Sequence, residues 1–581
     1  MERPSPQSQP VRFGLFELDV RSGELRKEGI RIRLQEQPVQ ILAILLENQG
    51  QVVSREELRK RLWPEDTFVD FDHSLNKAIT KLREALGDSA EHPQFIETLA
   101  KRGYRFFGHS KVSSRHIRSL LVLPLENLSR DPEQEFFAEG MTEALINTMA
   151  KIGALRVTSR TTAMRYKKTD KTLPQIAREL NVDAIVEGAV LRSADRVRVS
   201  AQLVDAHADA HLWAESYDRD LRDVLALQSE VAQAIARQVQ VTLTPQEQAQ
   251  FAQVHRVNPE AYEAYLKGRY HWNRRSGEEL PRAVQCFQQA IVKDSDYAAA
   301  YAGLADSLAA LGIWGFVSPK ESCGEARGFG LRALELDPAL GEAHASLAWV
   351  DAWYERDFTA AEKEFERSIE LNPRYPTAHY FFGFYLGLMG RYEEAYTECK
   401  RALRLEPLSS AMHWGFGFVL LLSRRYDRAI EEADRSLELD PAFVGAHALH
   451  GWAYPNKSRH DLAIASLRKA VELSQGASQW VGSLGEAYAN AGYKDEARKI
   501  LHQLNDLSKQ RYVTPYIVAR IHAALGEHDD AFQWLETAFQ ERATWMAFLK
   551  TDPLLDSLRP DVRFQDLLRR MNFPSEGPSA R

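Results

Sequence analysis

Hydrophobic and polar positions divide the chain into three stretches of different character. Near the N-terminus, three short β-prone runs separated by turn residues predict a small antiparallel sheet: Val11 to Asp19, Gly23 to Lys27 and Ile30 to Leu34. Between residues 119 and 245, apolar strand-like runs alternate with helical segments, which is typical of an α/β domain. From residue 256 onward the pattern predicts stacked helices.

Three helices should follow the first sheet. Pro38 opens an apolar segment that Gly50 ends, and Ser54 caps the next helix, with Glu57 completing a capping box. A third helix is expected in SLNKAITKLREALG, which places one apolar stripe inward: Leu75, Ile79, Leu82 and Leu86. The segment FIETLAKRGYRFFG then predicts two strands around a basic turn.

This order of sheet, three helices and hairpin resembles the OmpR/PhoB-type winged helix-turn-helix over residues 8–108. LNKAITKLREALG lies at the position of the recognition helix and ETLAKRGYRF at the wing, and the match ends in the family's GYRF, Gly103 to Phe106. The resemblance implies that the third helix enters the major groove of double-stranded DNA while the wing contacts an adjacent minor groove or the backbone.

The resemblance also names candidate DNA contacts. They are Asn76, Lys77, Thr80, Lys81 and Arg83 on the helix, and Lys101, Arg102 and Arg105 at the wing. The recognition face is less Arg-rich than is usual in the family and holds Glu84, so we expect modest affinity that dimerisation on tandem sites would raise. The plainer alternative is that these are solvated surface charges.

In relatives of this type the loop between the second and third helices can contact RNA polymerase. Here that loop runs from Trp63 to His73, and Trp63 itself is expected to anchor the core. A linker at residues 109–118 follows the domain. The stretch from Lys101 to Arg118 has six basic and no acidic residues, whereas residues 1–110 as a whole carry 17 of each sign.

Residues 119–245 resemble the TolB N-terminal-like domain, in LPLENLSRDPEQEFFAEGMTEALI and in the segment that begins LNVDAIVEGAVLRS. Asp131, Glu133 and Glu135 could suggest a metal or acid/base cluster, but carboxylates at a helix start also complement the helix dipole. Arg160 and Arg165 could bind an anion, or be ordinary surface cations. We expect no cofactor and no metal.

A repeated phrase marks residues 256–570. The seven copies are separated by 36, 43, 35, 34, 34 and 34 residues: Asn258-Pro259, Asp294-Ser295, Asp337-Pro338, Asn372-Pro373, Glu406-Pro407, Asp440-Pro441 and Ser474-Gln475. This is the period of tetratricopeptide (TPR) repeats, whose helix pairs stack into a curved solenoid with an inner groove. Small residues recur in step, as at Ala326, Ala361, Ala395, Ala429, Ala463 and Ala497 and at Ala290, Ala333, Ser368, Ala402, Ser436 and Ala470.

Four histidines occupy equivalent places in successive repeats: His344, His379, His413 and His447. Equivalent sites in stacked helix pairs lie on the order of 10 Å apart, too far for one metal ion to bridge. Packing within each repeat and a titrating ladder are the two interpretations. The cysteines Cys286, Cys323 and Cys399 are widely spaced, which favours reduced packing residues.

Charge, apolar runs and missing motifs restrict which other classes of protein the chain can belong to. A net charge of −7 over 581 residues gives no global signature of a nucleic-acid binder, and the strongest apolar run is far shorter than the ~20 residues that span a bilayer. We therefore expect a cytoplasmic protein without membrane contact. Phosphate-loop, HExxH and GxSxG motifs are absent from the sequence, so we expect no enzyme.

The sequence thus predicts a multidomain chain: an α+β winged helix-turn-helix, an α/β domain and an all-α TPR solenoid. The favoured function is a sequence-specific transcription regulator whose activity is controlled by a protein or peptide in the TPR groove. A non-catalytic interaction scaffold and a small-molecule sensor in the middle domain are the alternatives. About ten residues precede the first strand, which leaves no room for a receiver domain, so we expect the signal to enter through the middle and TPR domains.

Overall fold

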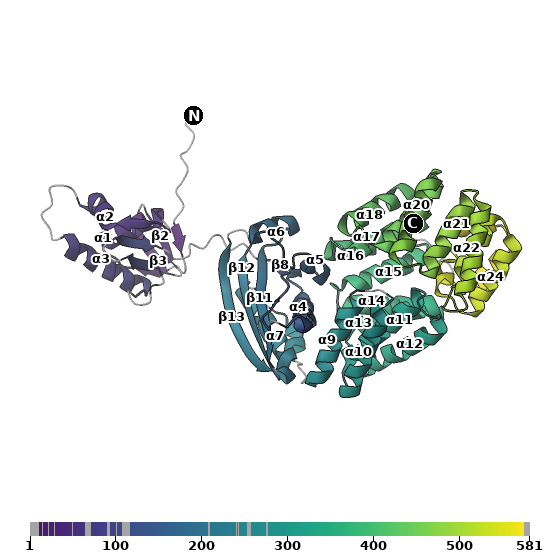
Figure 1. Cartoon of the computed structure of the whole chain (residues 1–581). Coiled ribbons are helices and arrows are strands. Elements are labelled where there is room, and N and C mark those ends of the chain that lie inside the picture. The colour runs from purple at the N-terminus through teal and green to yellow at the C-terminus, as the bar shows by residue number, and fades with distance from the viewer. Residues whose placement is uncertain are drawn as a thin grey trace, which may run out of the picture. The chain divides into compact units, whose positions relative to one another are not determined.

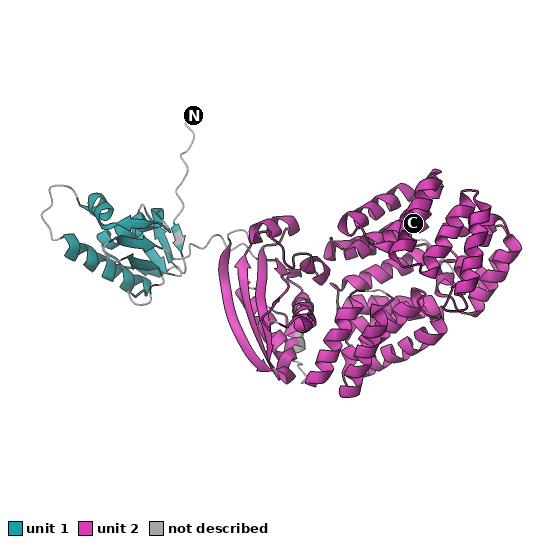
Figure 2. Cartoon of the chain, viewed as in Figure 1, with its two compact units in different colours: residues 1–116 teal, residues 117–581 magenta. Residues whose placement is uncertain are grey.

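The protein, a computed structural model, folds into two compact units, residues 1–116 and 117–581 (Figure 2). The structure describes residues 11–574 apart from 14–15, 21, 28–29, 49, 64–70, 90–92, 94, 100–101, 107–116, 130, 194, 207–208, 240, 242, 253–256 and 275–276.

Unit 1 begins with an antiparallel meander in the order β1-β2-β3-β4. Its strands are β1 (Val11–Phe13), β2 (Phe16–Asp19), β3 (Glu24–Lys27) and β4 (Ile30–Ile32). The expected sheet is therefore confirmed, but its first run forms two strands. The chain reverses between Phe13 and Phe16, which pair across the turn and stack their rings 5.6 Å apart.

Three helices and a second sheet complete unit 1. They are α1 (Glu36–Glu47), β5 (Val52–Ser54), α2 (Arg55–Leu62), α3 (Phe71–Leu86), β6 (Ile96–Leu99) and β7 (Gly103–Phe106), with the strands in the order β5-β7-β6. Ser54 caps α2 as expected, because its Oγ accepts from the Glu57 amide at 3.1 Å. The four leucine and isoleucine residues of the expected stripe on α3 are all buried.

Unit 2 opens with a six-stranded sheet in the order β10-β8-β11-β12-β13, in which β9 also pairs with β11. The strands are β8 (Ser119–Val122), β9 (Glu126–Asn127), β10 (Arg156–Val157), β11 (Ala184–Ser193), β12 (Arg196–Asp205) and β13 (Ala210–Asp220). The pairs among β8, β9, β10 and β11 are parallel, and β11, β12 and β13 are antiparallel. The α/β class expected here is confirmed.

Helices cover one face of this sheet (Figure 1). The helices that pack on its strands are α4 (Glu135–Ala150), α6 (Leu173–Leu180) and α7 (Val224–Gln238). This part of the chain also contains α5 (Arg160–Met164) and α8 (Pro245–Ala252), a short turn before α4 at Pro132–Gln134 and one before α7 at Leu221–Asp223. Along β12 the inward residues Val197, Val199, Ala201 and Leu203 are buried, whereas the alternate positions are exposed at Arg196 and Arg198 and half-buried at Ser200 and Gln202. The strand-like apolar runs expected in this part of the sequence include this strand.

The rest of unit 2 is helical, and its described residues form eight helix pairs. They are α9 (Pro259–Trp272) with α10 (Glu279–Lys293), α11 (Ala298–Ile313) with α12 (Pro319–Leu336), α13 (Gly341–Val350) with α14 (Phe358–Leu371), α15 (Pro376–Met389) with α16 (Tyr392–Leu405), α17 (Ser410–Leu422) with α18 (Tyr426–Leu439), α19 (Val444–Ala453) with α20 (His460–Leu473), α21 (Ser478–Asn490) with α22 (Lys494–Leu507), and α23 (Pro515–Leu525) with α24 (His528–Gln540).

Shorter turns and a last helix complete the array. A π-turn at Asp351–Glu355 extends α13 and a 3-10 turn at Tyr454–Lys457 extends α19. After α24 come the 3-10 turns η5 (Thr544–Phe548) and η6 (Pro553–Leu558), and then α25 (Val562–Arg570). The twelve small residues that recur in step with the repeat are all at most 1% exposed, so the predicted close helix crossings are confirmed.

The first helices of the pairs lie on the inside of the curved array. Each packs against the next first helix from α11 to α23, whereas among the described residues second helices approach the following second helix less closely. We call the inner side of α11, α13, α15, α17, α19, α21 and α23 the groove. Its floor is aromatic, with Trp349, Phe381, Phe384, Phe418 and Trp452 in one buried cluster.

Candidate DNA-recognition surface

The third helix of unit 1 presents a polar face beside the wing. Asn76, Lys77 and Thr80 are exposed on α3, while Leu75 and Ile79 on its opposite side are buried. The helix is held by the core on its apolar side, so the polar side chains project from a fixed backbone. This is the arrangement that a groove-reading helix requires.

Asn76 is tied to its neighbours through its side-chain oxygen. The Asn76 Oδ1 accepts from Arg55 Nη2 and from the Tyr104 hydroxyl, each at 3.1 Å. Arg55 also donates to Tyr104 at 3.0 Å and to Asp72 at 3.1 Å. Burial raises the pKa of Tyr104, which keeps its hydroxyl a donor. The network fixes the Asn76 amide group and locks α3 to the strand that carries the wing.

The other candidate DNA contacts on α3 differ in their exposure and in the hydrogen-bond partners they already have. Lys77 is exposed, and Thr80 donates its hydroxyl back to the Asn76 carbonyl at 2.9 Å. Lys81 is half-buried, and its Nζ donates to Gln35 Oε1 at 2.7 Å. Lys77 and Thr80 are therefore the most accessible of these residues to DNA, and Lys81 can reach a phosphate only by breaking its hydrogen bond to Gln35.

Arg83 lies in the interior. It is 9% exposed, and its Nη2 donates to the Ile96 carbonyl at 2.7 Å and to the Thr98 hydroxyl at 2.9 Å. The guanidinium therefore joins α3 to β6 and points away from the polar face. The resemblance named Arg83 as a candidate DNA contact, but the sequence could not show that β6 would cover this side chain.

The wing is the turn between β6 and β7. Arg102 is exposed at this turn, and Arg105 on β7 pairs with Glu97 on β6, with Nε and Oε2 2.8 Å apart. Gly103 has a φ of +151°, and a Cβ at this position would lie 2.0 Å from the Val53 carbonyl oxygen. Only glycine allows β7 to approach β5 so closely, which explains the first letter of the GYRF motif.

Two expectations fall partly outside the described residues. Lys101 is among the residues that the structure does not describe, as is most of the loop expected to contact RNA polymerase, residues 64–70. At the edge of that loop, Trp63 packs its ring against Phe71 with centroids 5.0 Å apart and is part of the core of unit 1. The expectation that Trp63 anchors the core agrees with this contact.

Comparison with known protein families identifies two parts of the chain. Residues 29–106 match the family described as "Transcriptional regulatory protein, C terminal". These residues form a domain of that family. Residues 387–442 and 444–476 match tetratricopeptide repeat families, so the prediction of TPR repeats is confirmed, while its bounds of 256–570 stay a prediction. The resemblance of residues 119–245 to the TolB N-terminal-like domain stays a prediction.

Several curated relatives match larger or smaller parts of the chain. Transcriptional regulator HilA of Salmonella typhimurium is 22% identical over 386 residues, 66% of this chain and 68% of that protein. The cholera toxin transcriptional activator of Vibrio cholerae is 40% identical over 74 residues, 13% of this chain and 25% of that protein. Putative adenylate cyclase 3 of Rhizobium meliloti is 35% identical over 245 residues; the chain thus spans about two fifths, 41%, of that relative.

The charged residues of the middle domain have structural partners. Asp131 caps the turn before α4 by accepting from the Glu133 amide at 2.9 Å, and Glu135 pairs with Lys167 at 2.6 Å. Arg160 pairs with Glu139 at 2.9 Å, while Arg165 donates to carbonyls of the TPR region, those of Leu408 and Leu439, each at 3.1 Å. The helix-start interpretation accounts for Asp131 and Glu135, whereas Arg160 and Arg165 have partners within the chain and are not ordinary surface cations.

Three of the four equivalent histidines join the two helices of their repeat, whereas the fourth, His447, contacts only the Pro441 carbonyl through Nε2, at 3.0 Å, among the described residues. The Nδ1 atoms of His344, His379 and His413 lie 2.5, 2.6 and 2.7 Å from Glu364, Glu398 and Glu432. Their Nε2 atoms face the carbonyls of Pro338, Pro373 and Pro407 at 2.9 to 3.3 Å. Each of these three imidazoles thus lies between two hydrogen-bond acceptors of its own repeat, which supports the packing interpretation.

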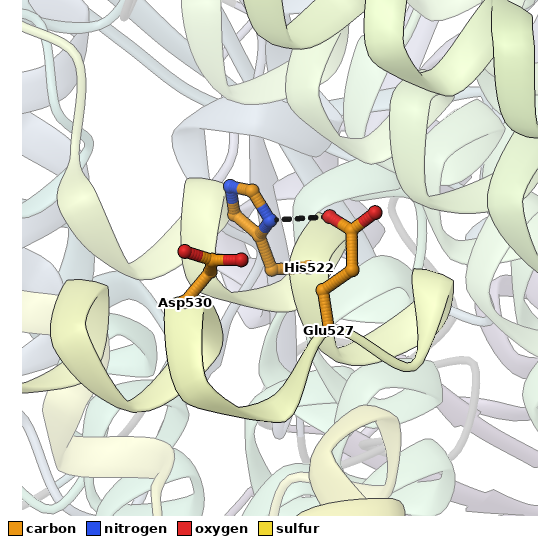
Figure 3. Close-up of side chains that lie close together, drawn as sticks. All are labelled: His522, Glu527 and Asp530. Carbon is orange, nitrogen blue, oxygen red and sulfur yellow. Dashed lines mark hydrogen bonds and ion pairs between the residues drawn. The ribbon is translucent and has the colours of Figure 1, made fainter.

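One further cluster has the composition of a metal site (Figure 3). His522, Glu527 and Asp530 each offer a ligand atom, and these atoms lie within 4.8 Å of one another. Glu527, however, already pairs with His522 at 2.8 Å and with Arg498 at 3.0 Å. A histidine in the last turn of α23 and carboxylates in the first turn of α24 also suit the two helix dipoles, so we assign the cluster to these helix ends.

No helix in the described part of the chain combines the length and the apolar character that crossing a membrane requires.

Proposed function

We propose that the chain is a sequence-specific DNA-binding transcription regulator and that its winged helix contacts double-stranded DNA. The observation that supports this most strongly is the exposed polar face of α3 beside the wing, within a domain of a regulator family. In the proposal Asn76, Lys77 and Thr80 contact bases or phosphates, and Lys81, Lys101, Arg102 and Arg105 contact the backbone. Arg83 positions the wing instead of touching DNA.

The affinity of this surface should depend on very few cations. Lys77 and Arg102 are exposed, whereas Lys81 and Arg105 have partners within unit 1. Each phosphate contact contributes about one unit to the slope of log K against log salt. A second copy of the chain on a tandem site would double the contacts, which is how we propose that weak half-sites become a specific operator.

The test uses the full chain and a duplex that it selects from a random-sequence pool. Replacing Lys77 and Arg102 with Ala should lower affinity roughly tenfold or more and reduce the salt slope by about two. The matched control removes two exposed cations from the first sheet, Lys27→Ala with Arg31→Ala, and should leave both quantities unchanged. Failure to select any duplex, or equal salt slopes in the two double variants, would contradict the proposal.

We further propose that the TPR region is where a protein partner acts on the regulator, and that the chain is not an enzyme. Support comes from the tetratricopeptide matches and from a regulator match that extends over 66% of the chain. Because a putative adenylate cyclase matches 41% of the chain, the purified protein should also be incubated with ATP. Formation of cyclic AMP would contradict the non-catalytic part of the proposal.

The middle domain offers one feature that favours a sensor as the second candidate. A shallow hollow of about 580 Å³ lies over β11, β12 and β13, where small residues such as Gly188, Ala189 and Ser200 leave room beside Glu187 and Glu215. A metabolite that raises the melting temperature of the full chain, and loses this effect in Ser200→Leu, would support a ligand at this sheet. A shift retained in Ser200→Leu would exclude it.

A further inference from the structure

The groove of the TPR region contains part of the same chain. After α24 the residues Thr544–Leu558, which we call the C-terminal segment, leave the last repeat and run along the inner side of earlier ones. Thr544 donates its hydroxyl to the Ile313 carbonyl of α11 at 3.2 Å. Lys550 donates to the Met389 carbonyl of α15 at 3.3 Å. Residues more than 150 positions apart in sequence are therefore in direct contact.

Two aromatic side chains form the centre of this contact. The Trp545 ring lies 6.0 Å from that of Trp452 on α19 and 6.3 Å from that of Phe418 on α17. Phe548 packs edge-on against Phe418 at 5.2 Å and against Trp353 at 6.3 Å. Pairs of this geometry add to the burial of the rings themselves. The segment thus packs on aromatic residues of three repeats, the third, fifth and sixth helix pairs of the array.

The apolar side chains around this pair are also buried. Met546, Leu549, Leu555 and Leu558 are each 0% exposed, and they belong to the same hydrophobic cluster as the groove residues. Apolar burial of this extent is typical of a docked peptide ligand, in which a few large anchors provide most of the affinity. The segment therefore has the features of a ligand and not of a surface loop.

Acidic residues fix the end of the segment. Asp552 accepts from the Tyr516 hydroxyl of α23 at 2.8 Å, and Asp556 pairs with Arg424, after α17, at 2.6 Å. The groove consequently matches a definite chemical pattern: two aromatic residues three positions apart, a following leucine, and two carboxylates four positions apart.

We propose that the TPR groove is a binding site for an aromatic and acidic peptide segment, that the chain occupies it with its own residues 544–558, and that an outside protein enters only by displacing them. This deepens the TPR part of the proposed function and does not depend on DNA binding. The apparent affinity of an outside segment is the intrinsic affinity multiplied by the fraction of molecules whose groove is open. The partner is therefore a protein that carries the same pattern of side chains.

The experiment offers the groove its own segment in trans. The probe is a fluorescent peptide of residues 542–560, and the control peptide has Ala in place of its two aromatic anchors. The chain is compared as wild type and as Trp545→Ala with Phe548→Ala. The matched control is Trp534→Ala, because Trp534 on α24 is 37% exposed. Binding is read by fluorescence anisotropy and helical content by circular dichroism.

The double variant should bind the probe at least about tenfold more tightly than the wild type and Trp534→Ala, and no chain should bind the control peptide. Equal binding by wild type and double variant, or no binding by a helical double variant, would overturn the proposal. If the double variant loses helicity, Asp556→Lys is tested in its place, because it places a cation against Arg424 without creating a cavity. It should also tighten probe binding, and unchanged binding in Asp556→Lys would overturn the proposal too. Selection of DNA duplexes by the same protein samples tests the winged helix separately, so a failure of the groove proposal can be distinguished from a failure of DNA binding.

Discussion

Replacing Arg83 with Ala separates a residue that positions the wing from one that touches DNA. The guanidinium makes two charged hydrogen bonds to β6, and such bonds contribute roughly 1.5–3 kcal/mol each. Its buried Nε has no hydrogen-bond partner among the described residues, so part of that gain is offset by desolvation. We expect the variant to lower the free energy of unfolding of residues 1–116 by about 2–3 kcal/mol.

The assay measures stability and salt dependence together. For a domain of this size, a loss of that magnitude lowers the melting temperature by roughly 10 °C or more. At a temperature where the variant is still folded, its slope of log K against log salt should equal that of the wild type, since no phosphate contact is lost. An unchanged melting temperature together with a slope reduced by about one unit would refute the reasoning and make Arg83 a DNA contact.

Two further variants test other parts of the chain. Gly103→Ala should destabilise residues 1–116 by at least about 2 kcal/mol, because its Cβ would meet the Val53 carbonyl. Gly87→Ala, with open space around it, should cost only about 1 kcal/mol. Thermal melts of both variants measure this difference in stability. Burial, aided by nearby Asp552, raises the pKa of Glu486 from 4.5 to about 7, although the Arg520 guanidinium that pairs with Glu486 opposes this rise. The folded state then binds more protons than the unfolded state between these values, so unfolding free energy falls by about 3 kcal/mol as pH rises through that window. Glu486→Gln should abolish this fall in urea titrations at pH 5 and pH 8, and a persisting fall would contradict the assignment.

Local patterns predicted most of the secondary structure. The buried stripe of helix α3 follows from hydrophobic periodicity, and the small residues of the TPR region follow from the repeat spacing. The signals are local because a helix or strand needs only its own residues to expose one apolar face. The fold class and the two recognised families were therefore accessible from the sequence alone.

Contacts between distant segments could not be predicted in this way. The burial of Arg83 depends on β6, and the reversal between β1 and β2 divides what looked like one strand. Nor does any local signal show that Trp545 packs on Trp452, because an aromatic residue after the last repeat is compatible with a simple cap. The candidate DNA-binding face was visible in the sequence, but the side chains that hold it in place were not.

The return of the C-terminal end of the chain to earlier repeats has a consequence for how this protein can evolve. Near the C-terminal segment, Arg542 pairs with Glu355 at 2.8 Å, and Phe573 stacks on Phe358 at 5.0 Å, so the last repeat touches the third helix pair. An open solenoid tolerates duplication or deletion of a repeat, because each unit meets only its neighbours. In this array, one added or lost repeat would carry the end of the chain past its contacts. We expect that homologues keep the number of repeats constant and vary instead in the loops on the outer side of the array, away from the groove.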